Sequence, residues 1–254
     1  MRATKPLVGI YSLTSCEGCQ VSILNLEEEF LKLCDLVEIK HFPLIKEREY
    51  SGKVSVAFVE GTVVRKEEIE KLREIRKNAK VLVALGTCAT YGGVASIRDF
   101  ADRERVMKCV YPDPMFLESI RNVRGLDCYV KVDYALRGCP IVAEEFVQLI
   151  KDILLNKKPM LVEEPVCVEC RKNKNICFLL KGEKCLGPLT YGGCNSVCIN
   201  EGRPCYGCRG PLKEANLEAL MQLFRKHKIP FSEIRNTLTV FAGTSKRYRR
   251  GVLR

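Results

Sequence analysis

The stretch Val81-Leu82-Val83-Ala84-Leu85-Gly86-Thr87-Cys88 decides the fold, because a fully apolar run leads directly into a glycine and a cysteine. Five consecutive apolar residues are typical of a buried strand. A charged amphipathic helix is expected just before this strand, over residues 66–78, and a further strong strand over residues 54–59. A strand, a helix and a strand in this order predict a βαβ unit, and hence a parallel sheet.

The same alternation runs through the first 156 residues. The other elements that the pattern predicts there are strands at residues 7–11, 36–40 and 129–132 and helices over residues 21–31 and 143–156. Strands that alternate with helices form a mainly parallel, doubly wound sheet. We therefore predict a flavodoxin-like α/β domain over residues 1–156.

The pattern changes after the closing helix. Two proline-containing turns, Lys157-Lys158-Pro159 and Glu163-Glu164-Pro165, indicate a linker, and residues 166–210 have no sustained helical or strand period. A helical pattern returns over residues 212–226. A segment with so little regular structure cannot build its own core, and bound metal clusters can hold it together. We therefore predict a second, small and irregular domain over residues 157–254, stabilised by iron–sulfur clusters.

Twelve of the 15 cysteines fall into three sets of four. The first set is spread over the predicted α/β domain and consists of Cys16, Cys19, Cys88 and Cys139. Its members follow predicted strands or precede a helix, and the loops at the carboxyl ends of parallel strands converge on one crevice. The other eight cysteines lie close together in the C-terminal part: the second set is Cys167, Cys170, Cys177 and Cys185, and the third set is Cys194, Cys198, Cys205 and Cys208.

Four thiolates suit either a [4Fe-4S] cluster or an all-cysteine zinc site. An odd number of cysteines without a secretory signal argues against a disulfide framework. Zinc ribbons generally use two Cys-x2-Cys pairs per ion, whereas the second and third sets contain one such pair each. Iron–sulfur clusters tolerate irregular spacing, and a ligand next to proline, as at Cys139-Pro140, is common in them. The spacing therefore favours iron–sulfur clusters and leaves zinc as an alternative.

Composition and charge narrow the possible partners. No apolar run approaches the roughly 18 residues of a membrane-spanning helix, and residues 1–6 show no export signal, so we expect a cytoplasmic protein that binds no membrane. The formal charge is +11, which would suit a nucleic acid. Three clusters of about −2 each would lower it to about +5, so we expect no nucleic-acid partner. A zinc-containing nucleic-acid-binding protein is the alternative from another class.

Four sequence blocks, in this order, resemble the small subunit of [NiFe] hydrogenases: Cys16-Glu17-Gly18-Cys19, Gly86-Thr87-Cys88-Ala89-Thr90-Tyr91-Gly92-Gly93, Arg137-Gly138-Cys139-Pro140 and Gly202-Arg203-Pro204-Cys205-Tyr206-Gly207-Cys208. The resemblance covers about residues 7–210. It implies that the first set holds a proximal cluster, the third set a medial cluster and the second set a distal cluster. It also implies a nickel–iron centre in a separate large subunit, no catalytic residue in this chain, and electron transfer to a further iron–sulfur or flavin subunit.

Two positions indicate the branch of the family that the chain resembles. Exported members usually have histidine as the first distal ligand and often proline at the position of Cys198, whereas Cys167 and Cys198 are both cysteines here. The resemblance thus implies three [4Fe-4S] clusters. It points to the soluble hydrogenases of the cytoplasm, in particular the NADP-linked delta subunits of archaeal sulfhydrogenases. A methanogen-type subunit, linked to heterodisulfide reductase or to the deazaflavin coenzyme, is the alternative.

The remaining candidate residues receive plainer interpretations. We expect Cys34, Cys109 and Cys128 to be ordinary core thiols. We expect neither His41 nor His227 to bind a metal. Glu17 is expected to be a solvated or interface-facing carboxylate, and the cations that could compensate for thiolate charge are Arg137 and Arg209. The basic run Lys246-Arg247-Tyr248-Arg249-Arg250 is expected to be a solvated tail, or to dock on an acidic face of a partner.

Overall fold

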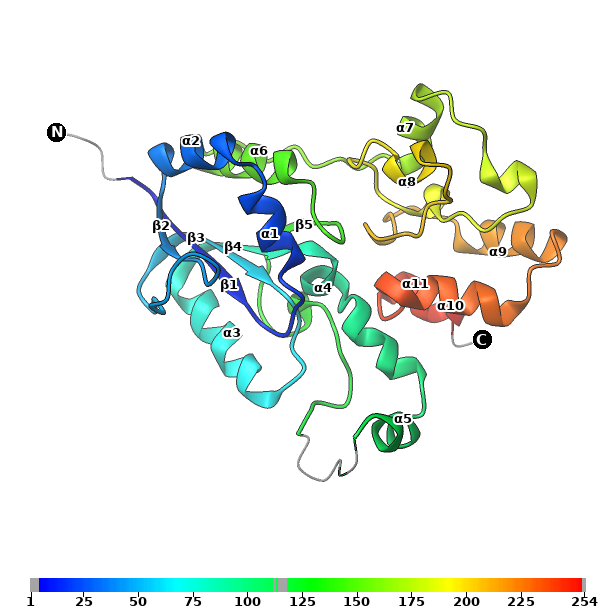
Figure 1. The fold of residues 1–254 in the computed structure, drawn as a ribbon, viewed down its shortest axis with the longest axis horizontal. Coiled ribbons are helices and arrows are strands. Elements are labelled where there is room, and N and C mark those ends of the chain that lie inside the picture. Colours follow the sequence, from blue (N-terminus) through cyan, green and yellow to red (C-terminus); the bar gives the residue numbers. More distant parts are fainter. Residues whose placement is uncertain (1–4, 112, 114–117, 253–254) are drawn as a thin grey trace.

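A computed structural model describes residues 5–111, 113 and 118–252 of the chain (Figure 1). Residues 1–4, where the sequence shows no export signal, lie outside the described residues. Figure 1 shows a sheet with helices packed on it, and beside it a C-terminal part of short helices and long loops. No helix within the described ranges is long and apolar enough to cross a membrane.

The sheet of the described residues has five strands, all parallel, in the order β2-β1-β3-β4-β5. Their bounds are β1 (Leu7–Ser12), β2 (Glu38–His41), β3 (Val54–Glu60), β4 (Ala79–Leu85) and β5 (Tyr134–Leu136). The predicted α/β class with a doubly wound parallel sheet is confirmed. In this strand order the chain runs outward in opposite directions from β1 and from β3, so the loops that follow these strands diverge and leave a crevice at the carboxyl edge of the sheet.

Helices cover both faces of the sheet. One face carries α1 (Gly18–Leu24), α2 (Glu28–Leu36) and α6 (Ala143–Leu154), and the other carries α3 (Lys66–Asn78) and α4 (Gly86–Tyr91). Each face has its own apolar core. The helix α3 matches its predicted bounds, and it begins at Lys66 because the Glu68 carboxylate accepts the Arg65 N–H at 2.9 Å.

Two predicted elements of the first part are wrong in detail. The predicted helix over residues 21–31 is divided into α1 and α2 by a turn in which Glu27 has a positive φ of 48°. The predicted strand over residues 129–132 is a loop, and its alternating apolar residues pack against the core beneath α3 without pairing. Pairing with β4 begins only where the Asp133 N–H donates to the Leu82 carbonyl at 2.9 Å, so β5 lies at Tyr134–Leu136.

The C-terminal part has more helix than its sequence pattern predicts. Its helices are α7 (Val166–Lys172), α8 (Val197–Asn200), α9 (Leu217–Lys226), α10 (Phe231–Ala242) and α11 (Lys246–Val252), with the short 3-10 helices η3 (Phe178–Lys181) and η4 (Gly187–Leu189). The last three helices enclose an apolar core that also takes in Leu186 and Leu189. This part of the chain therefore has a core of its own, built mainly from residues beyond the cysteine-rich segment.

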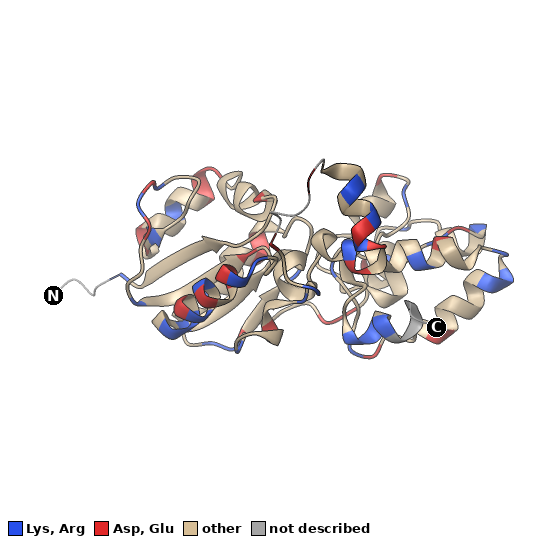
Figure 2. Ribbon diagram, turned by 90° about the horizontal axis from the view of Figure 1, so that it is seen from below, with Lys and Arg blue, Asp and Glu red and all other residues tan. Residues whose placement is uncertain are grey.

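The basic run at the C-terminus is a helix, and the expectation of a solvated tail is wrong. It forms α11, whose lysine and arginine residues lie next to the C-terminus in Figure 2. Tyr248 in its middle is only 1% exposed and packs into the core shared with α9 and α10. Burial of this one aromatic side chain fixes the helix, while Arg247 and Arg249 on either side remain exposed.

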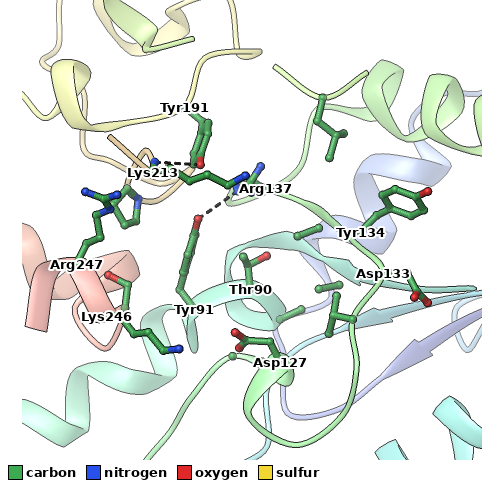
Figure 3. Close-up of a pocket in the computed structure, with 18 of the residues that line it drawn as sticks. Thr90, Tyr91, Asp127, Asp133, Tyr134, Arg137, Tyr191, Lys213, Lys246 and Arg247 are labelled. Atoms are coloured by element: carbon green, nitrogen blue, oxygen red, sulfur yellow. Dashed lines mark hydrogen bonds between the residues drawn. The ribbon is translucent and has the colours of Figure 1, made fainter. Parts of the chain in front are cut away.

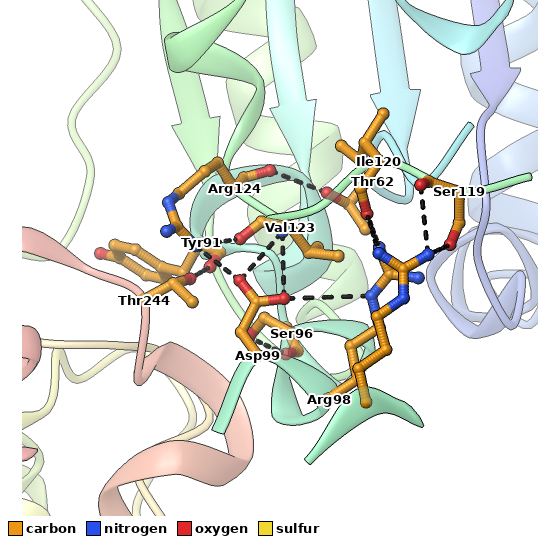
Figure 4. Close-up of polar contacts among 12 residues, drawn as sticks. Thr62, Tyr91, Ser96, Arg98, Asp99, Ser119, Ile120, Val123, Arg124 and Thr244 are labelled. Carbon is orange, nitrogen blue, oxygen red and sulfur yellow. Dashed lines mark hydrogen bonds and ion pairs between the residues drawn. The ribbon is translucent and has the colours of Figure 1, made fainter. Parts of the chain in front are cut away.

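Contacts between the two parts run mainly through α10, which packs on α4 and on the 3-10 helix η1 (Val94–Phe100). Figure 4 shows polar contacts beside this interface: within the first part, the Asp99 carboxylate accepts the Val123 N–H at 3.0 Å and pairs with Arg124 at 2.8 Å. Close by, the Thr244 hydroxyl donates to the Tyr91 carbonyl at 2.6 Å.

The remaining elements are α5 (Arg103–Val110) and the 3-10 helix η2 (Leu126–Cys128). The division at residue 156 stays a prediction.

Candidate metal centres

The first cysteine set lies at the carboxyl edge of the sheet, where the strand order leaves a crevice. Cys16 follows β1, Cys19 is on α1, Cys88 is on α4 directly after β4, and Cys139 follows β5. Cys88 was expected in a loop, but Gly86-Thr87-Cys88 begins a short helix. Burial raises the pKa of the Cys139 thiol to about 11, and the neighbouring Cys88 and Cys16 thiols add to the rise. The structure thus brings together thiols that are far apart in sequence.

The first set opens to the surface. Cys16 and Cys139 are exposed, Cys88 is half-buried, and Cys19 is buried. Two glycines keep the space beside the inner thiols free of side chains. A Cβ on Gly86 would lie 2.5 Å from the Cys19 Sγ, and a Cβ on Gly93 would lie 2.5 Å from the Cys88 Sγ. Both glycines have positive φ, so the backbone and the space both require the absence of a side chain.

Glu60, at the end of β3, is a functional residue that sequence reasoning missed. It is 2% exposed, and its carboxylate accepts the Cys19 N–H at 3.0 Å and the Gln20 N–H at 3.2 Å. These bonds hold the first turn of α1, and with it Cys19, against the sheet. The signal was an acidic residue at the carboxyl end of an otherwise apolar strand. Burial, and after it the Glu60 charge, raises the pKa of the Cys19 thiol far above its usual range.

The second set is assembled around α7 and a buried apolar cluster. Burial raises the pKa of the Cys167 thiol to about 11, and the thiols of Cys185, Cys170 and Cys177 raise it further. Cys170 and Cys185 are buried, and they pack in one cluster with Val166, Phe178, Ile199 and Cys205. Three of the six buried residues of this cluster are cysteines. The packing in this region is therefore made in large part by the candidate ligands themselves.

The third set lies on α8 and in the loops before and after it. Burial raises the pKa of the Cys208 thiol to about 11 against the lowering effect of the Cys139 backbone N–H, and the Cys194 and Cys198 thiols contribute to the rise. Cys205 is the most buried member, and burial raises the pKa of its thiol well above the usual value. Thiols with raised pKa values carry protons at neutral pH, so binding of metal at these sites must release protons.

The third set lies between the other two in space, although it comes last in the sequence. On one side the hydroxyl of Thr87, the residue before Cys88, donates to the Cys208 carbonyl. On the other side the Cys205 backbone N–H donates to the Cys185 Sγ at 3.4 Å. The spatial order is therefore first, third, second. Within the described part of the chain, no three cysteine, histidine or acidic side chains lie close enough to hold a single metal ion.

The two arginines beside the cysteine blocks have different environments. Arg209 is buried, pairs with Glu145 at 2.8 Å, and lies near enough to Cys194 to favour its thiolate. Arg137 instead lines a cavity of about 960 Å³ between the two parts (Figure 3). Its guanidinium lies 4.1 Å from the Tyr191 ring centroid, and its Nε donates to the Tyr91 hydroxyl at 3.1 Å. The expected charge compensation therefore fits Arg209 and not Arg137.

The other candidate residues lie outside the three sets. Cys34 is half-buried, but Cys109 and Cys128 are exposed, so the expectation of core thiols is wrong for these two. The reason for Cys109 is that α5 buries none of its side chains. His41 stacks on Tyr11 with ring centroids 4.6 Å apart, and His227 is the residue that ends α9. Glu17, half-buried beside Cys16, accepts a hydrogen bond from the Ser12 hydroxyl at 3.0 Å.

Comparisons with known proteins agree with this geometry. Residues 16–153 match a family described as NADH ubiquinone oxidoreductase, 20 Kd subunit. The chain is 36% identical, over 92% of its length and 98% of the relative, to sulfhydrogenase 2 subunit delta of Pyrococcus furiosus. It is 30% identical, over 80% of its length and 81% of the relative, to a vhu subunit of the F420-non-reducing hydrogenase of Methanocaldococcus jannaschii.

A solved structure also indicates a likeness to hydrogenase subunits. A chain of an NAD+-reducing [NiFe]-hydrogenase in the H2-reduced state superposes with a TM-score of 0.57 at 30% identity, and the match covers 62% of this chain and 95% of that one. The family match includes three of the four cysteine blocks that carried the resemblance in the sequence. This chain therefore belongs to the 20 Kd subunit family of NADH ubiquinone oxidoreductase and, within it, to the iron–sulfur small subunits of [NiFe] hydrogenases, oxidoreductases whose Ni-Fe site is in a partner large subunit.

Proposed function

We propose that this chain carries electrons between the Ni-Fe site of its large subunit and a further iron–sulfur or flavin subunit, through three [4Fe-4S] clusters. The first set would hold the proximal cluster, the third set the medial cluster and the second set the distal cluster, with the residues Cys16, Cys19, Cys88, Cys139, Cys194, Cys198, Cys205, Cys208, Cys167, Cys170, Cys177 and Cys185 as ligands. The observation that carries this proposal is the spatial order: hydrogen bonds join the third set to the first through Thr87, the neighbour of Cys88, and to the second through Cys185.

The residues around the sites fit this group. Bound there, a [4Fe-4S] cluster supplies one-electron transfer. The chain supplies four thiols at each site, the space left by Gly86 and Gly93 at the first set, and an apolar cluster that excludes water at the second. The Cys205 N–H donor on the Cys185 sulfur stabilises the thiolate form and so helps to set the reduction potential.

The exposed side of the first set suits a docked large subunit. Cys16 and Cys139 face the surface, and the apolar side chain of Val94 beside Cys88 is 48% exposed. Val21 on α1 is exposed as well. Apolar side chains around exposed thiols mark a surface that a partner covers, and a covered site keeps water away from the cluster. Hydrogen would be turned over in that partner, and this chain would carry only the electrons.

The relatives support two candidates for the electron acceptor of the assembled complex. The likeness to a sulfhydrogenase delta subunit supports a hydrogenase that also reduces sulfur or polysulfide. The link to NADP and the location in the cytoplasm belong to the proposal and rest on the resemblance of the sequence motifs. A second candidate, the methanogen-type hydrogenase, is favoured by the likeness to the F420-non-reducing hydrogenase of Methanocaldococcus jannaschii. Neither candidate changes the role of this chain. The two differ in the acceptor that the assembled complex reduces with hydrogen, namely NADP or a heterodisulfide.

Affinity purification of the tagged chain from its native cells tests the proposal. We expect a complex with a nickel-containing large subunit and a flavin-containing subunit, with iron in this chain and hydrogen-dependent reduction of NADP. Reduction of a heterodisulfide and not of NADP would select the methanogen-type alternative. A colourless protein that contains zinc, lacks iron and binds nucleic acid would contradict the proposal and support the zinc-containing class.

A further inference from the structure

Two threonines on the short helix α4 make different hydrogen bonds. The Thr90 hydroxyl donates to the Gly86 carbonyl at 2.9 Å, a bond within its own helix. The Thr87 hydroxyl leaves the helix and donates to the Cys208 carbonyl, in the third cysteine set. It also accepts the Gly138 N–H at 3.2 Å. Thr87 therefore links three segments that carry candidate ligands, since Cys88 and Cys139 are the next residues after Thr87 and Gly138 in the chain.

The link between these segments is buried, and the Thr87 hydroxyl both donates and accepts a hydrogen bond in it. Thr87 is 1% exposed, and a hydroxyl group offers one donor, which goes to Cys208, and acceptor capacity, which Gly138 uses. The Thr87 backbone N–H also donates to the Gly138 carbonyl at 2.9 Å. Removal of the hydroxyl alone would leave a buried carbonyl and a buried N–H without their partner, which is costly inside a protein.

The position of this link is where the first set meets the third. The Thr87 hydroxyl donates to the Cys208 carbonyl and accepts the Gly138 N–H, so the loops that carry Cys208 and Cys139 meet at Thr87. Gly138, just before Cys139, has a φ of +141°, a conformation that glycine adopts and that side-chain-bearing residues avoid. A turn that depends on glycine is easily deformed, and here the Thr87 hydroxyl ties it to the Cys208 loop.

We propose that Thr87 is a positioning residue that fixes the first cysteine set against the third and so sets the electronic coupling between the clusters bound there. The inference rests on the proposed function, because it concerns electron transfer between these two sites. Electron tunnelling weakens steeply with distance. A hydroxyl that holds the turn at Gly138 against the Cys208 carbonyl acts on the distance between the two sites.

Three variants of the assembled complex test this role. Thr87→Val keeps the shape of the side chain and removes the hydroxyl, Thr87→Ser keeps the hydroxyl, and Thr90→Val removes a hydroxyl from the same helix without touching Cys208. The readouts are the magnetic interaction between the first and third clusters in electron paramagnetic resonance and the rate of electron transfer between them. We expect Thr87→Val to weaken the interaction and to slow this transfer roughly tenfold or more.

The serine variant and the Thr90→Val control should both behave as the wild type. A Thr87→Val complex that contains iron and keeps the wild-type magnetic interaction and transfer rate would overturn the inference and leave the proposed function intact. Wild-type protein without iron would instead overturn the proposed function itself. If Thr87→Val does not assemble, assembly of Thr87→Ser supports a need for the hydroxyl, whereas failure of both variants would mean that packing alone is required and would overturn the inference.

Hydrogen exchange on the wild-type complex gives an independent readout. We expect slow exchange of the Gly138 and Thr87 N–H groups, because the first donates to the Thr87 hydroxyl and the second to the Gly138 carbonyl. Exchange of both groups as fast as in an exposed loop without hydrogen bonds would show that these bonds are absent and would overturn the inference.

Discussion

The first cysteine set and the other two are held by different kinds of structure. The first set lies at the edge of a sheet whose two cores are aliphatic and aromatic, and Cys19 is the one member of the set that is packed into them. The second and third sets lie in a segment where half of the buried cluster is cysteine. One site is added to a fold that has its own core, whereas the other two supply part of the core around them. We therefore expect metal binding and folding to be independent in the sheet region and coupled in the cysteine-rich region.

Removal of iron should have the largest effect, and it should change the two regions differently. In anaerobically chelated protein we expect residues 166–210 to lose protection against hydrogen exchange, because the thiols lose the bonds that hold their segment. The N–H groups of β1, β3 and β4 should stay protected, since their core contains no bound metal. Equal loss of protection in both regions, measured by mass spectrometry, would remove the distinction between them.

Arg209→Met should disrupt the boundary between the two regions. Arg209 and Glu145 form a buried pair at 2.8 Å, with side chains 5% and 18% exposed, that links the third set to α6. Loss of the arginine leaves a buried carboxylate, whose pKa burial already raises, without its cation. We expect the free energy of unfolding to fall by about 3–5 kcal/mol. A matched double variant with Glu145→Leu should recover much of this loss, and a double variant as unstable as Arg209→Met would contradict the account.

Leu82→Ala should act on the sheet alone. Leu82 on β4 is fully buried, and its truncation should cost about 2–5 kcal/mol in urea unfolding of the first region. Because iron binding at the second and third sets does not depend on this core, their share of the iron should stay bound at urea concentrations that expose the variant sheet. Release of all iron together with unfolding of the sheet would show that the regions are not independent.

Replacement of Asp133 should have the smallest effect on stability, and this effect should disappear in acid. Burial alone would raise the pKa of the Asp133 carboxyl, but the Leu82 N–H and the Arg76 guanidinium outweigh it and lower the pKa. A carboxyl whose pKa is lower in the folded state stabilises the fold above its unfolded pKa, and this contribution is lost as the pH falls below about 4. Asp133→Asn should therefore be less stable at neutral pH and should show a flatter loss of stability in that acid range. A parallel pH profile for both proteins would refute this.

Local patterns in the sequence were sufficient for most of the first region. The strands around Val81 and Val54 and the helix α3 follow from apolar runs and helical spacing, which depend on neighbouring residues. The strand β5 was placed wrongly because it has only three residues, and its start is fixed by the contact of Asp133 with Leu82. Tertiary contacts of this kind leave no local pattern.

The candidate sites were predictable as sets of cysteines, because spacing and known motifs are properties of the sequence. Their arrangement was not. The role of Glu60 depends on a contact with Cys19, which is 41 positions away in the chain, and the role of Thr87 depends on a contact with Cys208, which is 121 positions away. The burial of Tyr248 in a basic run depends on a core formed by three helices. Charge and exposure can be estimated locally, whereas hydrogen-bond partners across the fold require the fold itself.

The amount of iron and acid-labile sulfide in this chain, measured together with zinc after anaerobic separation from its partner subunits, tests the central claim most directly. If the three sets each hold a [4Fe-4S] cluster, we expect about twelve iron and about twelve sulfide per chain and no zinc. About four of each, with zinc or nothing in the C-terminal region, would contradict the account, because the first set alone would then carry a cluster.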